Sequence, residues 1–312
     1  MSLHKNKIVP HLWFNTQARE AAEFYCSIFP ASAITHSTTL LNTPSGDCDI
    51  VSFELSGCEF MAISAGPLFK FNPSISFFVN FDPSRDPEAA THLDAMWEKL
   101  SEGGIALMPL DAYPFSKRYG WIQDKYGLSW QLILTNPDNE ERPSIVPSLL
   151  FVGSVCGKAE EATDFYLSAF SRHTTDTSQT HRGMVVRYPA GMEPDKEGTI
   201  MFSDFMLAGQ WFASMDSAHQ HTFAFNEAIS LLVRCDTQEE IDELWKTLSA
   251  VPGAEQCGWL KDKYGLSWQI APTVMEEMMT HGTREQIDRL TQAFLPMKKM
   301  DIAALQKAYG SV

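Results

Sequence analysis

Hydrophobic positions at the start of the chain switch from strand-like to helix-like spacing and back. Residues Ile8 to Phe14 form an apolar run typical of a buried strand, and between Ala18 and Phe29 alanine and aromatic residues recur on one helix face. Three further strand-like runs follow at Ala33 to Leu40, Asp49 to Leu55 and Cys58 to Ser64. Because Ser56-Gly57 has the composition of a tight hairpin turn, the pattern predicts a β-α-β-β-β module.

The same order of elements recurs in the next stretch. Residues Ile75 to Phe81 are strand-like, and Asp86-Pro87 has the composition of a helix N-cap with proline at the first helical position. The apolar stripe of that helix consists of Leu93, Met96, Trp97 and Leu100. Shorter strands are expected near Ile105, Tyr119 and Trp130. The first half of the chain therefore contains two modules.

A twelve-residue segment indicates that the chain is a tandem duplication. Gly120 to Gln131 (GWIQDKYGLSWQ) returns 138 residues later as Gly258 to Gln269 (GWLKDKYGLSWQ), identical at ten of twelve positions. The first strand also recurs, since Ile145 to Phe151 matches Ile8 to Phe14. Four β-α-β-β-β modules, two in each copy, are therefore expected.

The repeat defines the domain organisation. The polar stretch between Asn136 and Pro143 contains two prolines and has the composition of a linker. We predict a first domain over 1–137, a linker over 138–143, a second domain over 144–274 and a helical tail over 275–312. In the tail the helical spacing is interrupted at Pro296, and Asp301 can cap a last short helix. This tail is expected to dock on the second domain.

Composition narrows the classes of partner. The formal net charge of −15 opposes electrostatic capture of nucleic acid or an anionic membrane, which leaves small molecules or proteins as partners. The six cysteines include no Cys-x-x-Cys pair and are expected to be ordinary thiols. Because the amino terminus lacks the long apolar stretch of a signal peptide or a membrane span, we expect a cytoplasmic protein.

These features resemble the vicinal oxygen chelate superfamily of glyoxalases, bleomycin-resistance proteins and extradiol dioxygenases. The resemblance lies in the paired modules, the segment Ala21-Ala22-Glu23-Phe24-Tyr25 and the two closing Gly-Trp-x-x-Asp-Lys-Tyr-Gly-Leu-Ser-Trp-Gln segments. With its tail Met297 to Leu305, the chain is most similar to the PhnB-like branch, whose members are labelled 3-demethylubiquinone-9 3-methyltransferases. The resemblance implies an α+β fold of tandem glyoxalase/bleomycin-resistance-like domains. Each domain consists of two β-α-β-β-β modules forming a curved mixed sheet, and a helical tail follows.

Strand alternation places candidate ligand-binding residues on the concave side of such a sheet. In the closing strand Trp130 lies on the face that a helix would cover, so Gln131 points to the other side, where this fold keeps its ligand site. Gln269 is expected to do the same in the second copy. His11 and Trp13 share one face of the first strand, and we expect them to join Gln131 in one cup. The alternative for the glutamines is a hydrogen bond to a neighbouring strand.

The resemblance also implies where a metal would bind. In metal-dependent relatives, His, Glu or Gln side chains from the first and last strands of each module converge on a divalent ion. By position, His11, Glu59 and Gln131 are the candidate ligands in the first copy, whereas the second copy has Ser148 in the place of the histidine, with Gln269. Neither set is complete. We therefore predict no cofactor, with a divalent metal as the alternative, and His11 can equally be a hydrogen-bonded structural residue.

An aromatic loop supplies further candidates. Residues Asp111 to Lys117, with Tyr113 and Phe115, have no counterpart in the shorter second copy. Such loops often line the mouth of a pocket, so these two side chains, Trp13 and Trp121 are candidates for an apolar ligand wall. The alternative is that they pack against one another.

Three functional hypotheses follow. We favour a small-molecule-binding protein without a complete metal site, which holds an aromatic or amphiphilic molecule between modules or domains. The alternative is a divalent-metal-dependent lyase, isomerase or dioxygenase acting on a small oxygenated substrate, and the third hypothesis is a structural or regulatory role. No residue is assigned a catalytic role.

The methyltransferase label of the relatives has no support in the sequence. A doubly wound domain that binds S-adenosylmethionine would need a strand, a glycine-rich turn and a helix near the start of the chain, and this sequence has no such stretch. A homodimer and a pairing of domains within one chain both remain compatible with the duplication.

Overall fold

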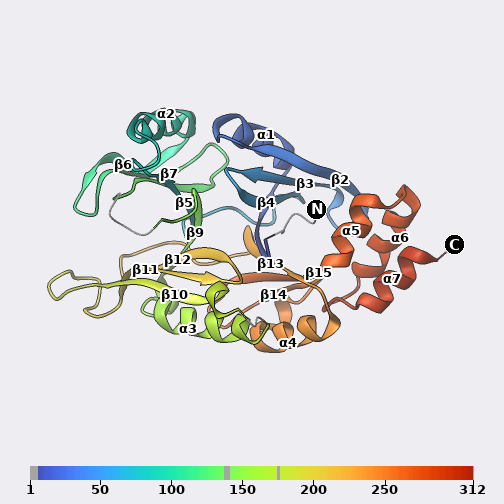
Figure 1. The fold of residues 1–312 in the computed structure, drawn as a ribbon. Coiled ribbons are helices and arrows are strands. Elements are labelled where there is room, and N and C mark those ends of the chain that lie inside the picture. Colours follow the sequence, from blue (N-terminus) through green and yellow to red (C-terminus); the bar gives the residue numbers. More distant parts are fainter. Residues whose placement is uncertain (1–5, 137–140, 174–175, 312) are drawn as a thin grey trace.

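Four modules succeed one another along residues 6–136, 141–173 and 176–311, the parts of the chain that the computed structural model describes (Figure 1). The first consists of β1 (Ile8–Phe14), α1 (Ala18–Ile28), β2 (Ala33–Thr43), β3 (Gly46–Leu55) and β4 (Cys58–Ser64). The second consists of β5 (Ile75–Phe81), α2 (Ala89–Ser101), β6 (Ile105–Tyr113), β7 (Ser116–Gln123) and β8 (Ser129–Leu134). The third consists of β9 (Ile145–Phe151), α3 (Ala159–Phe170), β10 (His181–Arg187), β11 (Ile200–Leu207) and β12 (Gln210–Asp216). The fourth consists of β13 (Ile229–Cys235), α4 (Gln238–Leu248), β14 (Trp259–Lys261) and β15 (Ser267–Pro272). The tail forms α5 (Thr273–His281), α6 (Arg284–Phe294) and α7 (Ile302–Gly310).

The modules differ from the predicted pattern in two details. The fourth has two strands after its helix instead of three, because Pro252–Ala254 forms a 3-10 turn in that region. Helix α2 begins at Ala89 and not directly after Asp86, whose carboxylate accepts a hydrogen bond from the backbone N–H of Glu88 in a turn that precedes the helix. Residues 138–140 of the predicted linker lie outside the described residues.

The modules pair across the two repeats. Sheet A, in the order β14-β15-β13-β1-β4-β3-β2, joins the first module to the fourth, and sheet B, in the order β10-β11-β12-β9-β5-β8-β7-β6, joins the second to the third. The junctions are antiparallel, between β1 and β13 and between β5 and β9. Two mixed sheets, each built from two modules, confirm the predicted glyoxalase-like fold, but the two modules of one copy lie in different sheets and do not form one sheet as predicted. Each sheet takes one module from each copy.

Both sheets are curved, and helices cover their outer faces. Figure 1 shows α1 and α2 along one side of the molecule and α3 and α4 along the opposite side, with the central strands between them. The curvature of sheet B brings Phe78 of β5 and Phe202 of β11 within 6.0 Å between ring centroids, although β9 and β12 separate these strands in the sheet. We call the concave faces cup A and cup B. The central side chains are His11, Met61, Ser230 and Gln269 in cup A, and Ser148, Ala213, Ser76 and Gln131 in cup B.

The repeated twelve-residue segment links the two sheets from the helix side. Asp124, between β7 and β8, accepts hydrogen bonds from the Trp130 indole at 2.9 Å and from the Tyr25 hydroxyl of α1 at 2.7 Å. It also accepts backbone N–H groups of its own turn, which Gly127 completes with a φ of +86°. Because Tyr25 belongs to the first module and Asp124 to the second, this contact joins a helix of sheet A to a hairpin of sheet B.

The second repeat contains the matching link. Asp262 accepts hydrogen bonds from the Trp268 indole at 2.9 Å and from the Tyr166 hydroxyl of α3 at 2.8 Å. Trp130 and Trp268 are both fully buried on the helix side, as the strand alternation predicted. Burying a carboxylate is costly, but the four hydrogen bonds that it accepts are strong and directional. The motif therefore fixes the position of each helix relative to the next module.

The C-terminal tail contacts both repeats and not the second alone. Asp301 caps α7, as predicted, and Gln238 of α4 donates to the carbonyl oxygen of Met300 at 3.0 Å. On the other side, Arg284 of α6 donates to the carbonyl oxygen of Thr39 in β2 at 3.2 Å. The tail therefore bridges the two ends of sheet A, as its position beside β2 and β15 in Figure 1 also shows.

Candidate functional site

Cup B is lined by an apolar cluster that is distinct from the main core. Successive residues of β5 and β9 point to opposite faces, so Phe77 and Ile145 belong to the main core whereas Phe78 and Val146 face the cup. The cup cluster consists of Phe78, Tyr119, Val146, Trp211 and Ala213, with the partly exposed Met108, Tyr113, Trp121, Ile133, Phe202, Met206 and Met215 packed against it. Aromatic and methionine side chains that solvent can reach on a concave face are typical of a site for an apolar molecule.

The floor of cup B is polar. Gln131 Nε2 donates to Ser76 Oγ at 2.7 Å, and Gln131 Oε1 accepts from the Tyr119 hydroxyl at 2.6 Å. Gln131 thus faces the cup and also makes the bond to a neighbouring strand that was its alternative role. Beside Ser76 lies Ser148, which is fully buried and whose Oγ has no hydrogen-bond partner among the described residues. A buried polar group without a partner costs on the order of 1–3 kcal/mol, so a ligand that bonds to this hydroxyl would gain by it.

Aromatic residues extend the wall of cup B to its rim. Tyr113 stacks on Phe115 with ring centroids 5.6 Å apart, and both meet the ring of Tyr119 edge-on. Phe115 is 61% exposed, so the stack reaches solvent. Trp121 is held against the wall because its indole N–H donates to Ser129 Oγ at 2.7 Å. The loop residues therefore pack against one another and still line the cup.

A compensated pair of charges lies at one end of cup B. The Arg142 guanidinium lies 3.8 Å from the ring centroid of Trp211, and its Nε donates to Asp204 Oδ2 at 2.7 Å. Asp204 leaves no room for a side chain at Gly183, because an added Cβ would clash with Asp204 Oδ1. Arg142 was not among the predicted site residues, because it lies in the linker, where no periodic pattern shows which way a side chain points.

Cup A contains the other predicted site residues. His11 is 3% exposed, and burial lowers the pKa of its imidazole to about 3, so the ring is neutral at physiological pH. Its Nδ1 has no hydrogen-bond partner in the described part of the chain, and the ring of Trp259 meets it edge-on at 5.6 Å. Gln269 Nε2 donates to Ser230 Oγ at 2.9 Å, as Gln131 does to Ser76. Trp13 lies beside them and donates its indole N–H to the carbonyl oxygen of Gly66.

The prediction that His11 and Gln131 share one cup is wrong. His11 and Trp13 lie on β1 in sheet A, together with Gln269, whereas Gln131 lies on β8 in sheet B, together with Trp121 and the aromatic loop. The error has one cause. Alternation along a strand determines the face on which a side chain lies, but it does not determine which module completes the sheet.

The side chains of neither cup fit a divalent metal site. In cup A, His11 has Met61, Ser230 and Gln269 as its neighbours, and in cup B the histidine is replaced by Ser148. Thioether, hydroxyl and amide groups are weak donors for a divalent ion, which usually needs three or more strong ones. Glu59 does not complete the set, because its Oε2 lies 2.8 Å from Arg234 Nη1 in an ion pair. The residues described contain no group of three or more His, Cys, Asp or Glu side chains placed to hold a metal ion.

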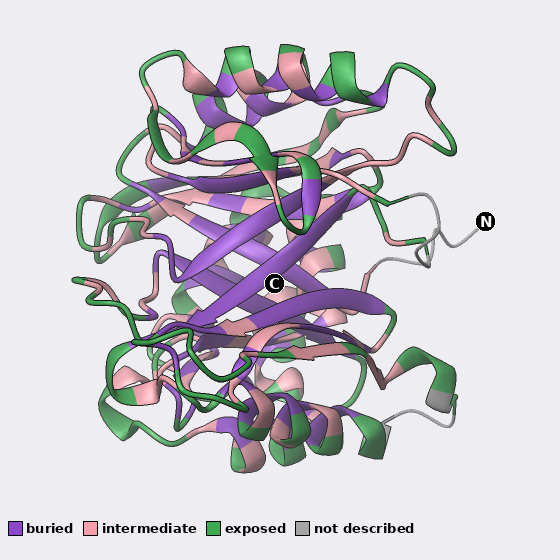
Figure 2. Ribbon diagram, turned by 90° about the vertical axis from the view of Figure 1, so that its left-hand side faces the viewer, coloured by how far each residue is buried: buried purple, intermediate pink, exposed green. Residues whose placement is uncertain are grey.

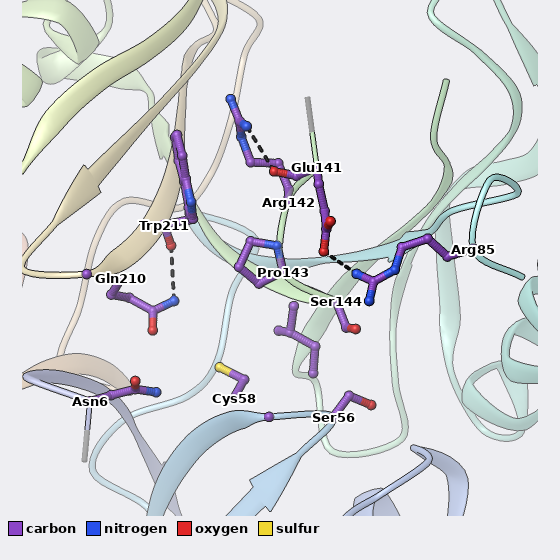
Figure 3. A pocket seen from close by; sticks show the side chains of 13 residues that line it. Asn6, Ser56, Cys58, Arg85, Glu141, Arg142, Pro143, Ser144, Gln210 and Trp211 are labelled. Carbon is purple, nitrogen blue, oxygen red and sulfur yellow. Dashed lines mark hydrogen bonds and ion pairs between the residues drawn. The ribbon is translucent and has the colours of Figure 1, made fainter. Parts of the chain in front are cut away.

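A separate cavity of about 270 Å³ lies at the seam between the repeats (Figure 3). Two arginines in its wall are already paired, Arg85 with Glu141 and Arg142 with Asp204. Burial, with smaller contributions from neighbouring glutamates, raises the pKa of the Cys58 thiol in the wall to about 12, so this thiol is protonated and unreactive at neutral pH. Cup B, with its apolar wall and its unpartnered hydroxyl, is therefore the better candidate site.

The fold and the two cups define a protein with a glyoxalase-like fold, built from paired β-α-β-β-β modules whose concave faces carry the candidate sites. The profile of the 3-demethylubiquinone-9 3-methyltransferase family matches the chain twice, over residues 6–133 and 143–271. The chain therefore belongs to this PhnB-like family.

Solved structures are similar to one repeat or to the whole chain. The PhnB protein from Bacillus cereus is 38% identical over 41% of this chain and 99% of its own length, with a TM-score of 0.37, so it corresponds in length to one repeat. A protein from Staphylococcus aureus is 30% identical over 42% of this chain and 97% of its own, with a TM-score of 0.17. Glyoxalase I from Zea mays is 11% identical over 88% of this chain and 98% of its own, with a TM-score of 0.51, which supports the tandem fold alone.

No curated protein matches the chain. None of the helices in the described residues is both long and apolar enough to cross a membrane.

Proposed function

We propose that this protein binds a small, uncharged aromatic molecule in cup B. The observation that carries the proposal is the combination of a partly exposed aromatic and methionine wall with a buried, unpartnered Ser148 hydroxyl at its floor. Apolar burial would supply most of the affinity, at about 25 cal/mol per Å² of surface removed from water, and the hydroxyl would orient the molecule.

The charges around cup B favour a neutral ligand. Arg142 and Asp204 form an ion pair with each other, and Tyr119 is a neutral phenol because burial raises its pKa far above neutrality. A charged ligand would lose its hydration shell against this apolar wall, and the charges of Arg142 and Asp204 already neutralise each other. A planar ring with one hydroxyl or carbonyl group meets both requirements of the site.

The first experiment compares two probes that differ in one hydroxyl group. Calorimetric titration with 2-naphthol and with naphthalene should give tighter binding of the naphthol, and 2-naphthol should raise the unfolding temperature of the protein by mass action. Because one hydrogen bond contributes about 0.5–1.5 kcal/mol, Ser148→Ala should remove roughly a 2- to 12-fold preference for the naphthol.

A matched control is available in cup A. Ser267 is also buried, and the contacts in the described chain leave its Oγ without a hydrogen-bond partner. Ser267→Ala should therefore keep the preference for the naphthol. If both variants keep it, or if 2-naphthol does not bind at millimolar concentration, cup B is not the site that we propose.

A further inference from the structure

We propose that the chain binds its ligand in cup B alone, because cup A is filled by its own side chains and covered by the C-terminal helices. One molecule per chain is then expected from a fold that offers two cups. The inference rests on the proposed function and adds to it which cup works, which residues make the difference and what stoichiometry results.

The two floors differ in the volume of their side chains. In sheet A, His11 lies beside Met61 of β4, and at the matching places in sheet B, Ser148 lies beside Ala213 of β12. Histidine for serine and methionine for alanine add about seven heavy atoms to the floor of cup A, comparable to a six-membered aromatic ring with a substituent, in a protein interior that is otherwise close-packed. At these two positions the floor of cup A is thus more filled by its own side chains than the floor of cup B.

The matching tryptophans of the two repeats also lie differently, and the one in cup A adds to the filling of its floor. Trp121 is held back against the wall of cup B by its bond to Ser129. Its counterpart Trp259 leans over the floor of cup A, where its ring lies 5.6 Å from the ring of His11 and 6.1 Å from that of Trp13. The serine that would hold Trp259 back is Ser267, whose Oγ lacks a hydrogen-bond partner within the described residues.

The C-terminal helices cover cup A from outside. Arg234, on the concave face of β13, donates to Glu59 of β4 at 2.8 Å and to Glu276 of α5 at 2.7 Å, so α5 is tied to the inside of the sheet. At the ends of β2 and β3, the concave residues Leu40 and Cys48 are buried in the same cluster as three apolar residues of α6: Ile287, Leu290 and Phe294.

In the part of the chain that the structure describes, no helix covers cup B as α5 and α6 cover cup A. Seen from the open side of sheet B, α1 and α2 lie above the central strands and α3 and α4 below them (Figure 2). The tail helices, which are the remaining α-helices of the described chain, lie at the opposite end of the molecule beside sheet A (Figure 1). The seven partly exposed side chains packed against the cup B cluster agree with this difference.

The test is a calorimetric titration of the full chain with 2-naphthol, followed by NMR of the protein labelled with ¹⁵N at its eight tryptophan indoles. We expect one naphthol per chain, a shifted indole signal for Trp121 and an unshifted signal for Trp259, with Trp121→Phe and Trp259→Phe as the assignment variants. Two molecules per chain, or a shift of Trp259 instead of Trp121, would overturn the inference while leaving small-molecule binding in place. No binding at all removes the proposed function, and this inference with it.

A second pair of variants tests the floor residues directly. Ala213→Met gives cup B the side chain of cup A and should weaken naphthol binding at least tenfold, whereas Met61→Ala should leave the affinity unchanged within twofold. Urea unfolding of both variants shows whether each remains folded. Weaker binding by Met61→Ala together with normal binding by a folded Ala213→Met would assign the ligand to cup A and overturn the proposal.

Discussion

Cup A and cup B have the same backbone plan but differ in what their concave faces contain. On the helix side the repeats are nearly identical, since Asp124 and Asp262 each bind a tyrosine from the helix of the preceding module, α1 or α3, and a tryptophan from the following strand. On the concave side the residues differ at the central position, His11 against Ser148, and only sheet A is covered by the tail. The contacts that fix the fold are thus the same in both repeats, whereas the residues of the concave faces differ.

The tail contact at Arg234 offers the largest expected effect. Arg234→Met should destabilise the protein by about 2–4 kcal/mol, because it leaves Glu59 and Glu276 without the cation between them. Both carboxylates are about a quarter exposed, so hydration offsets part of the loss. Urea unfolding measures the change, and naphthol binding in cup B should persist.

Arg284→Met is the matched control, because Arg284 also anchors the tail to sheet A but is 45% exposed. It should cost less than about 1 kcal/mol, as exposed ion pairs usually do. Equal effects of the two substitutions would mean that the tail does not depend on a buried anchor, and cup A would then be less firmly closed than we infer.

Much of this fold follows from local patterns in the sequence. The strand and helix spacing gives the modules, and the alternation around Trp130 correctly puts Gln131 on the concave face. The pairing of modules could not be obtained in this way, since β1 and β9 carry nearly the same apolar pattern and either can complete either sheet. Only the long-range register, β1 with β13 and β5 with β9, decides which residues meet.

The candidate site was predictable to the same degree. Tyr113, Phe115, Trp121 and Gln131 do come together in cup B, because a loop and two adjacent strands of one module carry them. His11 and Trp13 are absent from that cup, because their strand belongs to the other sheet. Ser148 was visible in the sequence only as a position where the histidine is missing, and its significance depends on burial that no local pattern reports.

His11 makes the two cups differ in their response to acid. Burial lowers the pKa of its imidazole from 6.5 to about 3, so between these values the unfolded chain takes up a proton and the folded chain does not. Stability is therefore complete above pH 6.5 and is lost as the pH falls toward 3, by about 2 kcal/mol between pH 8 and pH 5. His11→Ser, which gives cup A the residue of cup B, should remove this part of the pH dependence in urea unfolding at the two pH values.

The control for this measurement is a histidine in solvent. His281 is exposed at the end of α5, so His281→Ser is the control substitution that removes a histidine without changing the floor of either cup. If the free energy of unfolding of His11→Ser falls between pH 8 and pH 5 by as much as that of the unsubstituted protein, His11 is not buried as a neutral ring. The floor of cup A would then be open to water.

The smallest expected effect concerns a hydrogen bond that cup B has and cup A lacks. The Tyr119 hydroxyl donates to Gln131 Oε1. The residue at the matching position of the second repeat is Cys257, whose thiol contacts the C-terminal tail and donates to the carbonyl oxygen of Leu295. Tyr119→Phe should lower the free energy of unfolding by about 1 kcal/mol, because a buried amide oxygen loses its donor. Tyr113→Phe, which removes a more exposed bond to Pro109, should cost less than half as much. If Tyr119→Phe does not change the free energy of unfolding, Gln131 Oε1 has found another hydrogen-bond partner, and the side chain of Gln131 can then also turn toward a ligand. If the loss appears as expected, Gln131 is fixed in place, and the hydroxyl of Ser148 is left to select what enters the cup.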